Sequence, residues 1–297
     1  MQSVAPRAVD LGGLTVRRLL PRSARRMIGP WCFLDLVGPL SFTSAAAMDV
    51  PPHPHIGIQT VTWLLEGEML HKDSLGSEAV ARPGVLNLMT SGRGIAHSEE
   101  TPADHSGRLH AVQLWVALPE AHRDGEPVFD EYRERPVVDL PGGRATVILG
   151  ELAQTHAAGR TFSPMMAADV TIDAGAEVVL PLSRAFEHGF VPLVGAATAA
   201  GQTLATDNLY YLEPGSDAVA LRAIGSGRVR VLLLGGAPCG ESILMWWNFV
   251  ARTTDEIVAA REDWQAHRRF GEVSRYAGAR LEAPAFVARP VPANPMS

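Results

Sequence analysis

The sequence predicts an all-β fold with a single helix near its C-terminal end. The 297 residues include 28 Gly and 22 Pro, which indicates many turns between short elements. Runs of β-branched and aromatic residues recur along the chain, and the strongest is Ile58 to Leu65, with the sequence IQTVTWLL. Only one stretch, after Thr253, has the spacing of an amphipathic helix. The length allows one large β-barrel or two compact halves.

The strand patterns fall into two groups separated by a polar stretch. The first group comprises a strand from Leu14, a basic turn and then strands over 31–36, 58–65, 69–73, 85–89 and 109–118. The second group lies near 145–149, 165–172, 176–181, 187–193, 209–213, 218–223 and 228–234. Residues 120–135 are polar and charged and Pro141 marks a turn, so a boundary is expected within 119–140. We therefore divide the chain into domains 1–130 and 131–297.

The predicted helix begins with a capping box. Thr253 can cap the helix and Glu256, three residues later, can bond back to the backbone of the cap residue. Apolar residues follow at helical spacing, which predicts a helix from about 254 to 269 that Gly271 ends. The tail from Pro284 to Ser297 contains four prolines and is expected to run extended over the surface.

Charge and cysteine content exclude some classes of function. The net charge of −6 gives no basic surface for a phosphate backbone, so we expect no direct binding to nucleic acid. The two cysteines, Cys32 and Cys239, form neither a disulfide framework nor a zinc ribbon pattern and fit a reducing cytoplasm. The first 30 residues lack the apolar segment of a secretory signal, and no apolar run is long enough for a membrane span. We expect a cytoplasmic protein without a membrane partner.

Two short stretches carry strong metal-ligand residues at i, i+2 spacing. They are His53 with His55, and His97 with Glu99. Because alternate side chains of a strand share a face, each pair can point the same way. Two neighbouring strands would then offer three imidazoles and one carboxylate to a single ion. This donor set suits Fe, Mn, Co, Ni, Cu or Zn, and a six-coordinate ion would keep two positions for substrate and oxygen.

These motifs resemble the pirin family of the cupin superfamily. The resemblance is carried by the two ligand pairs, the strand from Gln59 to Gly67, Pro83-Gly84, the segment GRGIAHSE over 92–99 and MWWNFV over 245–250. It covers roughly residues 15–275. It implies a bicupin, two antiparallel jelly-roll β-barrels, with a metal in the N-terminal domain and a metal-free C-terminal domain that carries the helix and the tail. It also implies that His53, His55, His97 and Glu99 are the ligands and that the ion is most often Fe(II).

One position departs from ordinary cupins. Their motif places a ligand Glu four residues after the second His, where this chain has Gln59. A neutral amide is a poorer ligand than a carboxylate, so Glu99 would supply the anionic oxygen instead.

The resemblance implies a quercetin 2,3-dioxygenase type of reaction, in which a flavonol is cleaved with O₂ and carbon monoxide is released. Glu99 is then the expected general base for the flavonol hydroxyl. An alternative is an iron-containing, redox-sensing interaction protein that regulates a transcription factor or a metabolic enzyme. Further candidates around the ion are Gln59, Glu66, Glu100 and Gln113 as hydrogen-bond partners and Leu34, Trp63 and Leu65 as lining. His71 and His110 are expected to be structural, and Arg93 either steers an anion or pairs with a local carboxylate.

Overall fold

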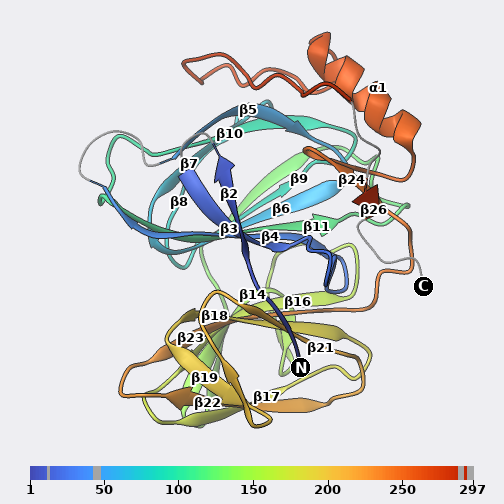
Figure 1. The fold of residues 1–297 in the computed structure, drawn as a ribbon. Helices are drawn as coiled ribbons and strands as arrows, with labels where there is room; N and C mark the ends of the chain where they lie inside the picture. The colour runs from blue at the N-terminus through green and yellow to red at the C-terminus, as the bar shows by residue number, and fades with distance from the viewer. Residues whose placement is uncertain (12–13, 43–47, 287–290, 293–297) are drawn as a thin grey trace. The chain divides into compact units, whose positions relative to one another are not determined.

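The computed structural model describes residues 1–11, 14–42, 48–286 and 291–292. The chain forms two compact units that interleave along the sequence, each built from antiparallel strands (Figure 1). We call the first barrel the unit made of Ala8–Val16, Phe33–Arg133 and Gly240–Ser297, and the second barrel the unit made of Met1–Arg7, Arg17–Cys32 and Glu134–Cys239. The predicted bicupin architecture of two β-barrels and one helix is confirmed.

The first barrel contains a seven-stranded and a four-stranded sheet. The seven-stranded sheet has the order β12(Val128–Tyr132), β9(Leu86–Thr90), β6(Ile58–Gly67), β11(Arg108–Ala117), β4(Trp31–Ser41), β3(Leu14–Leu20) and β2(Arg7–Leu11). The four-stranded sheet has the order β5(Asp49–His55), β10(Ile95–Glu100), β7(Met69–Asp73) and β8(Glu78–Ala81). Strand β6 pairs with β9 and β11 and is buried along almost its whole length, which explains its strong strand signal.

The second barrel repeats this plan with a larger and a smaller sheet. The larger sheet has the order β1(Gln2–Val4), β21(Leu209–Leu212), β18(Glu187–Val194), β23(Val229–Gly236), β16(Met165–Ile172), β14(Gly143–Leu152) and β13(Val137–Leu140), and β15(Thr155–His156) pairs with β14. The smaller sheet has the order β17(Glu177–Pro181), β22(Ala218–Ile224), β19(Ala196–Ala199) and β20(Gln202–Leu204). Val170 and Phe190 of the larger sheet share one core with Val178 and Leu221 of the smaller sheet. Apolar residues that alternate along both sheets therefore close the barrel interior.

The helix α1(Thr254–Gln265) packs against β25(Phe249–Ala251), beside β5 and β10 of the four-stranded sheet (Figure 1). Its buried residues Ile257, Ala260 and Trp264 share a cluster with Ile56, next to β5, and Ala96 of β10. Ala96 alternates with His97 along β10. The helix therefore packs behind the strands whose opposite face carries the candidate ligands.

The predicted capping box is present, because Thr253 accepts from the backbone of Glu256 and the Glu256 side chain accepts from the backbone of Thr253. The predicted end of the helix was too late. The chain leaves the helix at His267, which has a φ of 56°, and the amides of His267 and Arg268 bond to the carbonyls of Trp264 and Asp263. This is a Schellman motif with a histidine in the left-handed position that glycine usually fills.

Two further expectations concern the polar stretch between the strand groups and the C-terminal tail. The polar stretch 120–135 is not only a bridge, because it contains β12, which pairs with β9 in the first barrel. In the tail, 287–290 and 293–297 lie outside the described residues, and β26(Val291–Pro292) pairs with β24(Leu244–Trp246), which also pairs with β25(Phe249–Ala251). Among the described residues, no helix has the length and apolar character that crossing a membrane requires.

Candidate metal centre

Strands β5 and β10 bring three of the predicted residues together. The two strands are antiparallel, and His97 lies directly opposite His53. His55 follows on the same face of β5, and the potential donor atoms of His53, His55 and His97 all lie within 4.8 Å of one another. All three residues are buried, with 6%, 1% and 1% exposure respectively. The i, i+2 spacing therefore places these three histidines close together, as predicted.

Hydrogen bonds fix the orientation of the imidazoles on β5. His53 Nδ1 donates to the carbonyl oxygen of Pro51 at 2.9 Å, and His55 Nδ1 donates to the carbonyl oxygen of Asn248 at 3.0 Å. A carbonyl oxygen only accepts, so Nδ1 carries the proton in both rings. Each ring consequently has an unprotonated Nε2, the form in which imidazole binds a metal.

The third imidazole is oriented by a chain of side chains from β7. His71 Nε2 donates to Asp73 Oδ2 at 3.2 Å, and Asp73 Oδ1 in turn accepts from two backbone amides of the following turn. When His71 carries this proton alone, its lone pair is on Nδ1, which lies 3.3 Å from Nδ1 of His97. His97 donates across this contact and is left with an unprotonated Nε2 that lies 3.1 Å from Nε2 of His55.

This arrangement fits a cation. Three unprotonated nitrogens converge on one point, and lone pairs at this spacing repel one another unless a positive charge lies between them. Burial also lowers the pKa of His53 to about 4 and holds the pKa values of His55 and His97 well below their ordinary value of 6.5. At neutral pH no proton competes for these nitrogens, and three imidazoles suit a mononuclear transition metal.

Glu99 lies on the same face of β10, two residues beyond His97, and is outside the group of converging nitrogens. A bulge in the β5–β10 pairing falls between His97 and Glu99. Gln113 Nε2 donates to Glu99 Oε1 at 2.8 Å, and Thr62 donates to Gln113 Oε1 at 2.8 Å, which fixes the amide orientation. Burial raises the pKa of Glu99 from its ordinary 4.5 to about 7, although the hydrogen bond from Gln113 opposes this change.

Comparison with known proteins identifies the family of the chain. The chain matches the Pirin family over residues 13–116 and the Pirin C-terminal cupin domain over residues 167–271. It is 46% identical over 286 residues to a Pseudomonas aeruginosa protein named "Putative quercetin 2,3-dioxygenase", covering 96% of this chain and 90% of that protein. The chain belongs to the pirin family.

Solved structures place this pirin among cupins of known fold. A crystal structure of a quercetin 2,3-dioxygenase from Acinetobacter baumannii matches with a TM-score of 0.94 and 42% identity, covering 99% of this chain and 98% of that one. A bacterial pirin from Escherichia coli in complex with nickel(II) matches with a TM-score of 0.63 and 18% identity, covering 80% and 99%. At that identity the second likeness shows the fold alone.

Two contacts at the pirin site come from residues outside the predicted ligand pairs. His71 was expected to be structural, yet it contacts His97 and is stacked on Phe129 at a centroid distance of 4.2 Å. The signal was present, because His71 and Asp73 have the same i, i+2 spacing as the predicted ligand pairs. Asn248 contributes through its backbone, which no sequence pattern could reveal.

The other candidate residues differ in the partners that they contact. Gln113 reaches Glu99, whereas Gln59 donates to Thr90 at 3.0 Å. Arg93 is exposed and pairs with Glu126, which is the local ion pair expected of a turn residue. Leu34, Trp63 and Leu65 are buried as expected for apolar barrel residues. Trp115 contacts the candidate ligand His55 edge-on at a centroid distance of 5.0 Å and is stacked on Phe33 at 4.0 Å.

Proposed function

We propose that this pirin is a metal-dependent dioxygenase that cleaves a flavonol with O₂, releases carbon monoxide and leaves a depside. The observation that carries the proposal is the convergence of three uncharged, buried imidazoles beside a carboxyl group whose pKa is near 7. Relatives that share 42% and 46% of its sequence carry the name quercetin 2,3-dioxygenase, which supports a flavonol-like substrate.

His53, His55 and His97 would hold the ion, and Glu99 would complete the ligand set. We propose Fe(II) as the native ion, since a set of imidazoles and one carboxylate suits it, while Mn, Co, Ni, Cu and Zn remain compatible with the same donors. When bound, the ion lowers the pKa of the flavonol 3-hydroxyl and holds this oxygen in place.

Glu99 would act as the general base. Gln113 binds Oε1, so Oε2 is the oxygen that can accept the proton from the substrate hydroxyl. A carboxyl group with a pKa of about 7 exchanges protons readily at neutral pH. The burial of Glu99 limits its contact with water, and the Trp115 ring does the same for His55, so electrostatic interactions with the flavonolate would be strengthened.

The test is turnover of quercetin by the metal-loaded protein. The chain is purified without oxygen, loaded with Fe(II), and mixed with quercetin and O₂ while O₂ uptake and carbon monoxide release are measured. We expect one carbon monoxide for each O₂ consumed. His97→Ala should lose both the metal and the activity, whereas His122→Ala, which changes an exposed histidine of the same barrel, should retain both.

Absence of carbon monoxide with Fe(II), Mn, Co, Ni and Cu, in protein that holds one ion per chain, would contradict the dioxygenase proposal. A redox-dependent interaction with a regulatory protein would then be the better account of the same site.

A further inference from the structure

A cavity of about 550 Å³ opens at one end of the second barrel and is lined by residues of that barrel alone. The strand ends that surround it are the last residues of β14, the first of β16 and the first of β18. Because β16 and β18 both run antiparallel to β23, their first residues lie at the same end of the barrel. The next inward-facing residues, Ala168 and Phe190, belong to the packed core. The cavity is therefore the mouth of the barrel, a common place for a ligand.

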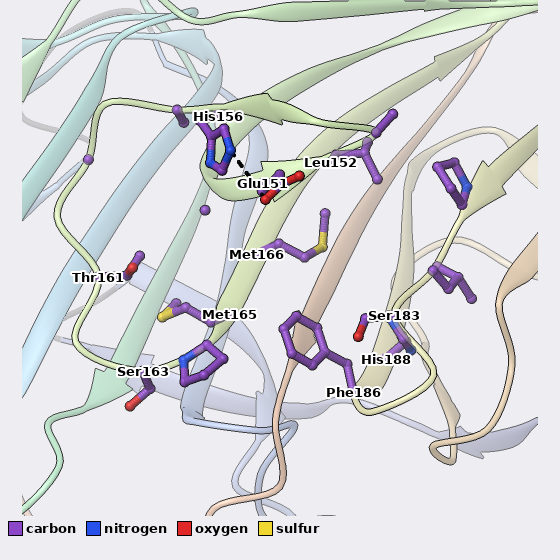
Figure 2. A pocket seen from close by; sticks show the side chains of 17 residues that line it. Glu151, Leu152, His156, Thr161, Ser163, Met165, Met166, Ser183, Phe186 and His188 are labelled. Carbon is purple, nitrogen blue, oxygen red and sulfur yellow. Dashed lines mark ion pairs between the residues drawn. The ribbon is translucent and has the colours of Figure 1, made fainter.

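The floor of this mouth is a row across three neighbouring strands. His188 on β18 pairs with Gly235 on β23, which pairs with Met166 on β16. A Cβ atom at position 235 would lie 3.1 Å from His188 Cδ2 and 3.1 Å from Met166 Cγ. Glycine at 235 thus lets the imidazole and the thioether lie close together, and Figure 2 shows both side chains, with Phe186, around the same space.

His188 carries an unused hydrogen-bonding group. Its side chain lines the cavity and is 1% exposed, and its Nδ1 has no hydrogen-bond partner among the described residues. A buried polar atom without a hydrogen-bond partner is energetically unfavourable, and a ligand hydroxyl would supply that partner. Burial lowers the pKa of His188 to about 4, so the ring is uncharged at neutral pH. Phe186 lies beside it in the cavity wall, with its ring centroid 6.2 Å from that of His188.

The lining selects an uncharged ligand. Among the described residues around the cavity there is neither Lys nor Arg, and its carboxylate, Glu151, pairs with His156 at 3.3 Å on the rim. The walls include Leu152, Met166 and Phe186, and methionine sulfur contacts aromatic rings favourably. The volume lies within the range of about 300–1,000 Å³ that is usual for small-molecule sites.

We propose that the mouth of the second barrel is a ligand site for a neutral aromatic molecule with a hydroxyl group, whose ring packs on Met166 and Phe186 and whose hydroxyl pairs with His188 Nδ1. This site is separate from the candidate metal centre and does not depend on the proposed dioxygenase activity.

The test uses 2-naphthol, with naphthalene as the matched probe that lacks the hydroxyl. The full-length chain is labelled with ¹³C at its methionine methyl groups and titrated with each probe. Met166 reports on the cavity, while Met69 and Met89 report on the first barrel. We expect 2-naphthol to shift the Met166 methyl signal in a saturable way and to bind more tightly than naphthalene.

Two variants distinguish specific recognition of the hydroxyl group from nonspecific partitioning of the probes into the cavity. His188→Phe keeps a ring but removes the hydrogen bond, and should weaken 2-naphthol binding by about three- to tenfold while naphthalene binding changes less than about twofold. Unchanged naphthalene binding also shows that the variant is folded. Val179→Phe, which adds a ring at an exposed position of the same barrel outside the cavity lining, should leave both affinities unchanged. Equal binding of 2-naphthol by wild type and His188→Phe, or shifts confined to Met69 and Met89, would overturn the proposal.

Discussion

Replacing Glu99 with Gln should stabilise the metal-free protein, and the gain should grow with pH. Below about pH 4.5 the carboxyl group is protonated in both the folded and the unfolded chain. As the pH rises from 4.5 to about 7, the unfolded chain ionises while the buried group stays protonated. Ionisation then favours the unfolded state, so wild-type stability falls over this range and levels off above it.

The magnitude follows from the two pKa values. Each pH unit between 4.5 and about 7 is worth about 1.4 kcal/mol, so ionisation lowers the free energy of unfolding by about 3 kcal/mol at pH 8.5. Glutamine cannot ionise and still offers an oxygen to Gln113. Glu99→Gln should therefore be more stable than wild type by about 3 kcal/mol at pH 8.5 and nearly equal to it at pH 4.5.

Urea unfolding in the presence of a chelator measures this difference. Five of the six tryptophans, all except Trp31, lie in the first barrel, so tryptophan fluorescence reports mainly on the unit that contains Glu99. Glu100→Gln is the matched control, since Glu100 is the next residue of β10 and pairs with Lys72 at 3.1 Å nearer the surface. It should change stability by less than about 1 kcal/mol. A gain for Glu99→Gln that is absent at pH 8.5, or equal at pH 4.5 and 8.5, would refute the reasoning.

Three further predictions concern other parts of the chain. Asp73→Asn places an amide donor opposite His71 Nε2, so that the His71 proton moves to Nδ1 and the His97 proton moves to Nε2. This variant should bind the metal about 10- to 100-fold more weakly in a competition titration. Retention of wild-type affinity would contradict the proton assignment. Thr253→Ala removes the helix cap and should lower the free energy of unfolding by about 1 kcal/mol in urea; Arg261→Ala, within the helix, tests whether the loss is specific to the cap. The pKa of His188 is lowered from 6.5 to about 4, so the unfolded chain takes up a proton at a higher pH than the folded chain does. The free energy of unfolding should therefore decrease as the pH falls from 6.5 to 4, and His188→Phe should reduce this decrease.

The parts of the fold that the sequence predicted well are those with local signals. Strands β6 and β16 follow runs of apolar and β-branched residues, and the helix cap follows from Thr253 and Glu256. Strand β12 was missed because all five of its residues are half-buried, so no alternation marks it. The end of α1 was misplaced because a histidine, not glycine, takes the left-handed position.

The candidate site divides in the same way. Spacing alone brings His53, His55 and His97 to one face, because alternation along a strand is a local property. The contacts that set their proton positions come from β7 and from Asn248, and depend on which strands become neighbours. The division of the chain at 130/131, the ligand roles of the four residues and the cytoplasmic location stay predictions.

The carbonyl of Asn248 that holds His55 has a consequence for biosynthesis. His53, His55 and His97 leave the ribosome early, but Asn248 belongs to the last fifth of the chain. Gly57 allows this late segment to approach closely, since a Cβ there would lie 2.2 Å from the carbonyl oxygen of Val250. A nascent chain that ends before Gly240 has all three imidazoles, but nothing fixes the proton on His55. We therefore expect the hydrogen-bonded arrangement of the three imidazoles to be complete only when synthesis is almost finished.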